Sequence, residues 1–203
     1  MRLEIRFIEL AAFAALTLAA MTATAKAADI DTAGATRCAM SGWSNDKDPA
    51  GLNVRAAPRA DAAIVATLPP ERRQGHDSYA VEFRIVGSRD GWLLIEKAKI
   101  VDYENGKGDR TIFAGRGWVS GAKVGFEIND AELRAAPRDD APVVARLYDN
   151  SDPAGSFGPD SAVVDRVFGC DGDYADVLLH MPKGKPMRGW ATRICSNQVT
   201  TCV

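Results

Sequence analysis

The sequence has 203 residues, of which 25 are Lys or Arg and 27 are Asp or Glu, so its formal net charge is −2. A weakly acidic chain without a dense basic stripe is a poor candidate for binding nucleic acid. Hydrophobic residues make up 46% of the sequence, which is enough to form a buried core.

Residues 1–27 have the features of a secretory signal peptide. Arg2 and Arg6 precede an uncharged apolar run over residues 10–20, and Ala25-Lys26-Ala27 forms an A-x-A cleavage site. A membrane anchor is the alternative, but an apolar run of this length is too short to span about 30 Å of hydrocarbon. We therefore expect a periplasmic or secreted protein with no membrane span after cleavage.

The next residues are expected to form a lead-in (28–40) and a first domain (41–128). Residues 38–51 are rich in turn-forming side chains, and residues 71–78 form a charged loop after Pro69-Pro70. Period-two alternation of apolar and polar side chains predicts short strands, of which the last two form a hairpin. These strands cover residues 52–55, 64–66, 81–85 and 92–96.

Residues 97–110 are expected to form an extended, exposed hairpin. Asn105-Gly106 favours a tight turn at its tip, with residues 98–103 pairing against 111–114. A short helical turn over 120–122 and a last strand over 123–128 complete the first domain. No stretch of the chain has a sustained helical period, so we predict an all-β fold.

The second domain (129–203) repeats the first. Residues 52–68 and 131–147 are identical at ten of seventeen positions without a gap, which indicates that one structural unit has been used twice. Residues 163–168 are expected to pair with 174–180. Only Asn129 and Asp130 link the two copies, so we expect a fixed mutual orientation.

The repeated motifs resemble the bacterial SH3 (SH3b) family. The resemblance is carried by LNVRAAP at residues 52–58, by Gly91-Trp92 and by Gly117-Trp118-Val119. Gly172-Asp173-Tyr174 and Gly189-Trp190-Ala191 stand in the same order in the second copy. The resemblance implies two tandem small SH3-like barrels, the first with a hairpin insertion, that bind peptidoglycan, its stem peptides or a protein.

Four cysteines in an exported chain predict two disulfides. We expect Cys170–Cys195 within the second domain and Cys38–Cys202 joining the two ends of the chain. Local pairing of Cys195 with Cys202 is the alternative. The absence of a C-x-x-C motif and of a Cys/His cluster argues against a zinc site.

The sequence does not predict an enzyme. Its two histidines, His76 and His180, lie far apart and in different copies, and G-x-S-x-G, H-E-x-x-H and phosphate-loop motifs do not occur. Asp171-Gly172-Asp173 offers too few oxygen ligands for calcium and reads as a turn. We therefore expect neither a catalytic residue nor a cofactor.

Aromatic and arginine side chains are the candidate ligand-binding residues. The aromatic candidates lie in or beside predicted turns, where they could stack on a sugar or contact a peptide; they are Trp43, Tyr79, Tyr103 and Tyr148. Arg55 and Arg134 recur at the same place in both copies and could grip a carboxylate. Their structural alternative is an ion pair, or a hydrogen bond to a carbonyl, that fixes the following turn. A protein partner held by the hairpin at 97–110 is the second functional hypothesis.

Overall fold

The structure, a computed structural model, describes residues 29–104, 106–148 and 157–199. The expected signal peptide and Cys202 lie outside the described residues. Within those ranges the chain is all-β, with short 3-10 turns as its helical elements. The strands of the first half are β1 Thr36–Ser44, β2 Leu52–Arg55, β3 Ile64–Leu68, β4 Arg72–Gln74, β5 Asp77–Tyr79, β6 Glu82–Arg89, β7 Trp92–Ile100 and β8 Arg110–Ser120. Those of the second half are β9 Val124–Gly125, β10 Glu127–Ile128, β11 Glu132–Arg134, β12 Val143–Arg146, β13 Val163–Asp171, β14 Tyr174–His180, β15 Met187–Ala191 and β16 Ile194–Cys195.

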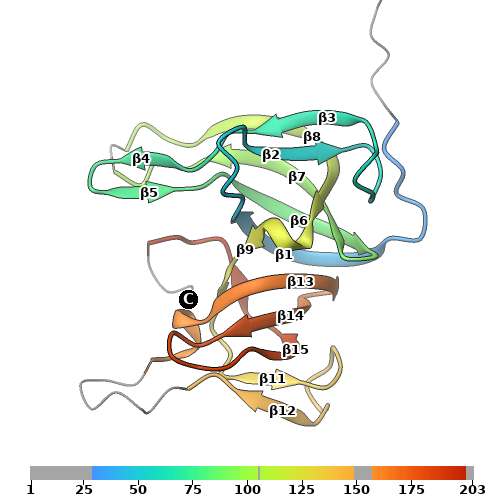
Figure 1. Cartoon of the computed structure of the whole chain (residues 1–203), viewed down its shortest axis with the longest axis vertical. Helices are drawn as coiled ribbons and strands as arrows, with labels where there is room; N and C mark the ends of the chain where they lie inside the picture. The colour runs from blue at the N-terminus through green and yellow to red at the C-terminus, as the bar shows by residue number, and fades with distance from the viewer. Residues whose placement is uncertain (1–28, 105, 149–156, 200–203) are drawn as a thin grey trace, which may run out of the picture.

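The first unit (residues 36–125) is a seven-stranded sheet that curls into a half-barrel (Figure 1). Its strand order is β3-β2-β8-β7-β6-β1-β9. The predicted hairpin is confirmed as β6 and β7, with Ile85 opposite Ile95 and both side chains fully buried. Alternation of buried and exposed side chains along these strands places one face of the sheet in the core.

The extended hairpin is also confirmed, because Ala98 pairs with Phe113 and Ile100 pairs with Arg110 at the outer ends of β7 and β8. The charged loop predicted at 71–78 is instead a second small hairpin, in which Arg72 pairs with Tyr79. Gly75 makes its turn possible, since its φ of 58° lies in the left-handed region that glycine tolerates best. Figure 1 shows this β4–β5 hairpin projecting from the first unit.

The longest strand that the sequence analysis missed lies near the start of the first unit. Residues 38–44, predicted to be turn-rich, belong to β1, which pairs with β6 and with β9. The lead-in is anchored as well, because the Trp118 indole donates a hydrogen bond to the Asp31 carbonyl at 2.8 Å. The Arg89 guanidinium contacts the Asp31 carboxylate at 2.6 Å, and this contact lowers the pKa of Asp31.

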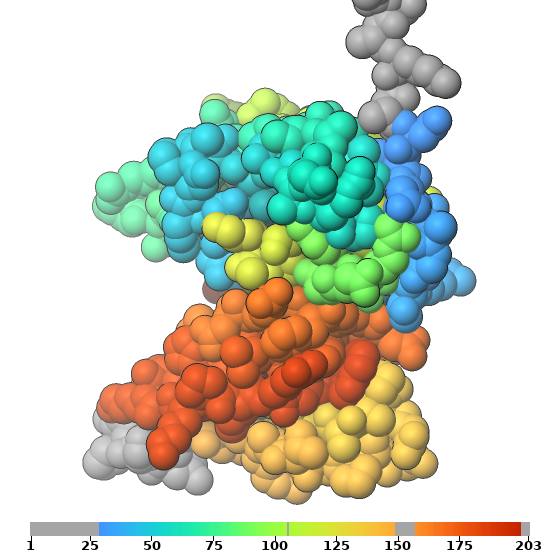
Figure 2. All heavy atoms as spheres, turned by 45° about the vertical axis from the view of Figure 1, so that its right-hand side comes forward, coloured from blue at the N-terminus to red at the C-terminus, as the bar shows by residue number. Residues whose placement is uncertain are grey.

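The second unit (residues 132–191) is a five-stranded sheet in the order β12-β11-β15-β14-β13. Its predicted hairpin is confirmed as β13 and β14. β13 packs against the first unit, where it contacts β1, β6, β9 and the 3-10 turn η1 (Gly121–Lys123). Figure 2 shows the two units stacked through this contact. The tail returns to the first unit's end, since β16 pairs with β10.

The disulfide pairing differs from the one expected. Cys38 of β1 bonds Cys170 of β13, across the contact between the units, with Cα atoms 5.6 Å apart. Both cysteines are buried. The predictions Cys170–Cys195 and Cys38–Cys202 are therefore wrong, because the packing of β1 on β13 brings Cys38 to Cys170, a contact that the sequence does not reveal. Cys195 is disulfide-bonded too, and its partner lies outside the described residues.

Candidate functional site

Arg55 and Arg134 occupy equivalent positions in the two units and serve the backbone. The Arg55 guanidinium donates a hydrogen bond to the Ala62 carbonyl at 2.7 Å, and Arg134 donates to the Ala141 carbonyl at 3.2 Å. A β-bulge precedes each arginine, and each pairs with a tryptophan, Trp118 or Trp190. These contacts match the structural alternative, in which the arginine fixes the turn that follows it.

Tyr79 and Tyr103 are brought together, and neither side chain is fully exposed. Their rings lie 4.8 Å apart, and Tyr79 is buried. The Tyr103 hydroxyl donates to the buried carboxylate of Glu82 and accepts a hydrogen bond from the Gln198 backbone at 3.2 Å. Burial, and secondly the bond to Glu82, raise the pKa of Tyr103 well above its usual range. Tyr103 is therefore an anchor for the C-terminal segment.

That segment binds the first unit through polar contacts. The Gln198 side chain accepts a hydrogen bond from the Ala80 N–H at 2.9 Å and donates one to the Ala80 carbonyl at 3.1 Å. The Ser196 hydroxyl donates to Glu82 at 2.8 Å. The Glu82 carboxylate thus accepts bonds from three groups, Tyr103, Ser196 and Gln198, and is well satisfied although buried.

The remaining aromatic candidates differ from each other. Trp43 is half-buried on β1, and its ring lies so close to Gly125 that a Cβ there would be 2.6 Å from the indole nitrogen. Trp43 is therefore a packing residue. Tyr148 is 55% exposed and lines a cleft of about 310 Å³ in the second unit.

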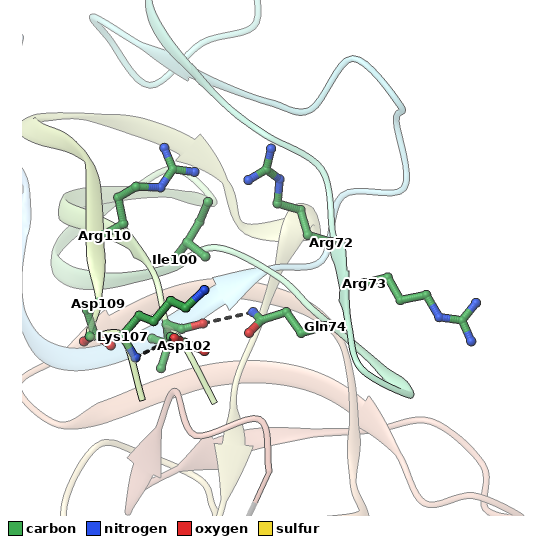
Figure 3. Close-up of a pocket in the computed structure, with 10 residues that line it drawn as sticks. Arg72, Arg73, Gln74, Ile100, Asp102, Lys107, Asp109 and Arg110 are labelled. Atoms are coloured by element: carbon green, nitrogen blue, oxygen red, sulfur yellow. Dashed lines mark hydrogen bonds between the residues drawn. The ribbon is translucent and has the colours of Figure 1, made fainter. Parts of the chain in front are cut away.

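A larger cleft, of about 730 Å³, opens in the first unit between the β4–β5 hairpin and the outer end of the β7–β8 hairpin (Figure 3). Side chains from both hairpins line it. Those on the β4–β5 side are Arg72, Arg73 and Gln74, and those on the β7–β8 side are Ile100, Val101, Asp102, Lys107, Gly108, Asp109 and Arg110. The Gln74 amide donates to the Val101 carbonyl at 3.0 Å and ties the two hairpins together.

The cleft is cationic although the chain is acidic. It contains four basic side chains and two acidic ones, and Asp109 is already paired with Lys99 at 2.6 Å. Within the part of the chain that the structure describes, the side chains of Arg72, Lys107 and Arg110 form no ion pair. Figure 3 shows the Arg72 and Arg110 guanidinium groups extending to the same side of the cleft, above Ile100. Guanidinium groups bind carboxylates through two parallel hydrogen bonds.

The two histidines lie in different units and do not come together. His180 Nδ1 lies 2.9 Å from Asp165 at the exposed end of the β13–β14 hairpin, and His76 lies in the turn of the β4–β5 hairpin, in the other unit. Among residues 29–104, 106–148 and 157–199, no group of His, Cys, Asp and Glu side chains is arranged to hold a metal ion. None of the helical segments in those ranges is long and apolar enough to cross a membrane.

No family model, no curated protein and no solved structure matches this chain. The arrangement of its own residues is therefore the basis for assigning a function. Of the predicted binding residues, only Tyr148 lies open beside a cleft. The sequence analysis missed Arg72 and Arg110, because basic and acidic residues alternate around both and the loop at 71–78 carries no net charge.

Proposed function

We propose that this chain is an exported, non-catalytic binding protein built from two SH3b-like units, and that it binds peptidoglycan through the carboxylates of its stem peptides. The single observation that carries the proposal is the cleft between the two hairpins of the first unit. Its converging arginines have no acidic partner among the described residues, and a ligand carboxylate would supply one.

The duplicated geometry supports the SH3b-like part of the proposal. In both units the motif Arg-Ala-Ala-Pro-Arg begins at a β-bulge, and the first arginine binds the carbonyl seven residues later. The buried Cys38–Cys170 disulfide is consistent with an oxidising compartment outside the cytoplasm.

The apolar wall of the cleft suits a peptide better than an inorganic ion. Ile100 lies between the two arginines, where it can contact the aliphatic part of a ligand whose carboxylates reach the guanidinium groups. Binding in such an open cleft depends on charge, so its strength should fall as salt rises.

Cosedimentation with purified sacculi tests the proposal. The protein without its proposed leader should sediment with the wall at moderate salt, and the R72Q/R110Q variant should remain in the supernatant. R59Q is the matched control, because Arg59 is exposed on the β2–β3 turn at the other end of the unit, where it contacts Asp61. Sedimentation of R72Q/R110Q at the wild-type level would refute binding through this cleft.

A protein-interaction module is the second candidate. It is favoured by the extended β7–β8 hairpin, which supplies most of the side chains around the cleft. If the protein fails to sediment with the wall yet captures an acidic periplasmic protein, and R72Q/R110Q abolishes that capture, this second function replaces the first.

A further inference from the structure

The two clefts occupy equivalent places in the repeated unit. The first is formed by the connection that follows β3 and by the connection between β7 and β8. The second is formed by the last residue of β12, by the chain that follows it and by the connection between β14 and β15. Because β12, β14 and β15 correspond to β3, β7 and β8 in strand order, duplication has placed a cleft at the same position twice.

The second cleft has the same chemical character as the first. Its lining among the described residues is Arg146, Tyr148, Met181, Lys183, Gly184, Lys185 and Met187, of which three are basic. Arg146 also contacts Glu132 at 2.5 Å, which fixes its guanidinium at the border of the cleft. Met181 is buried and forms an apolar base, while Tyr148 is exposed beside it. An anionic ligand with an apolar portion would fit these contacts.

The β4–β5 hairpin and the β14–β15 turn, which border the two clefts, lie on the same side of the molecule. In Figure 1 the β4–β5 hairpin and the turn between β14 and β15 both lie at the left of the view, and Figure 2 shows the same segments on one side after rotation. The units are held in this orientation by the packing of β13 and by the Cys38–Cys170 disulfide. One extended ligand, or two neighbouring strands of a polymer, can therefore reach both clefts.

We propose that the cleft around Tyr148, Lys183 and Lys185 is a second carboxylate-binding site, so that one chain binds a polyvalent anionic ligand at two places. The proposal rests on the proposed function of the first cleft for its ligand class. Two linked sites raise the effective concentration of the second binding event, which strengthens overall binding without any new contact.

Amide chemical shifts measured during a titration with tricarballylate, a small tricarboxylate, test each site separately. We expect two groups of shifts, one around Gln74 and Gly108 and one around Gly184 and Met187. The K183Q/K185Q variant should lose only the second group, and R72Q/R110Q only the first. R138Q, on the exposed β11–β12 turn, is the matched control for the second unit and should retain both.

The possible outcomes separate this inference from the proposed function. Shifts at the first cleft alone, or shifts around Gly184 that persist in K183Q/K185Q, would overturn the second site and leave the first intact. Shifts at the second cleft alone would support the second site and refute carboxylate binding at the first. Shifts at neither cleft would overturn both. If sacculi are the ligand, each pair of substitutions should lower the apparent affinity by about 100-fold or more.

Discussion

Ser88 and Cys170 exchange two hydrogen bonds across the contact between the units. The Cys170 N–H donates to the Ser88 hydroxyl at 2.9 Å, and that hydroxyl donates to the Cys170 carbonyl at 3.2 Å. Both residues are buried, and Cys170 also forms the disulfide to Cys38. The two units are therefore joined at this point by a covalent bond and by a satisfied polar contact.

Removal of this disulfide should destabilise the whole chain. The bond joins residues 132 positions apart. A loop of that length corresponds to about 5 kcal/mol in the chain-entropy estimate. We expect the C38A/C170A variant to lose stability of this order, measured as the free energy of unfolding in urea. S88A should cost about 1–3 kcal/mol, because it leaves the buried Cys170 N–H without a partner. A C38A/C170A variant as stable as wild type would contradict the assigned pairing.

The contact between the units also requires glycine at position 121. A Cβ added to Gly121 would lie 2.0 Å from the Val167 carbonyl oxygen of β13 and 2.9 Å from the Gly91 carbonyl oxygen. Both oxygens belong to the backbone, so they cannot rotate away as a flexible side chain could. We expect G121A to separate η1 from β13 and to cost about 3 kcal/mol or more. A122G is the control, since Ala122 is exposed in the same turn. Equal stability of G121A and wild type, measured by thermal unfolding, would argue against this packing.

The two repeated arginines should matter for stability and not for binding. R55M and R134M each remove the donor to a carbonyl of a buried residue, Ala62 or Ala141, and should each cost about 1–3 kcal/mol. Binding to sacculi, measured below the unfolding temperature, should change by less than about two-fold. A variant that keeps its stability but loses binding would show that the arginine contacts the ligand.

Tyr103 predicts a loss of stability in alkaline solution. Its pKa is raised in the folded state by burial and by the Glu82 carboxylate, whereas the unfolded value is about 10. The folded chain therefore holds this proton more tightly, so the stabilisation is complete below pH 10 and is lost as the pH rises further. In Y103F the free energy of unfolding should fall less steeply above pH 10. Y148F, at an exposed tyrosine, serves as the control; a wild-type slope in Y103F would contradict the prediction.

Local patterns predicted most of the strands. The β6–β7, β7–β8 and β13–β14 hairpins follow from alternation and turn residues, which act between neighbours in the sequence. β1 was missed because its inward side chains include Cys38, Gly42 and Ser44, which give no hydrophobic periodicity. Its partners β6 and β9 lie far along the chain, and their pairing cannot be read from the strand itself.

The binding surface was harder to predict than the fold. Exposed turns were expected to display Tyr79 and Tyr103, but Tyr79 is buried beside Tyr103, and the Tyr103 hydroxyl is bonded to Glu82 and to the Gln198 backbone. Arg72 and Arg110 belong to different hairpins, and only the tertiary structure brings them to one cleft. The sequence alone does not distinguish an arginine that lines a cleft from one in a charged loop that is surrounded by solvent.

Calorimetric titration with a soluble stem peptide tests the central claim most directly. The peptide with free carboxylates should bind, and the same peptide with every carboxylate amidated should bind at least about tenfold more weakly, since charge-assisted hydrogen bonds contribute about 1.5–3 kcal/mol each. R72Q/R110Q should lose the part of this discrimination that comes from the first cleft, whereas R59Q should retain all of it. Equal affinity of wild type for the free and the amidated peptide would contradict recognition of carboxylates by the cleft.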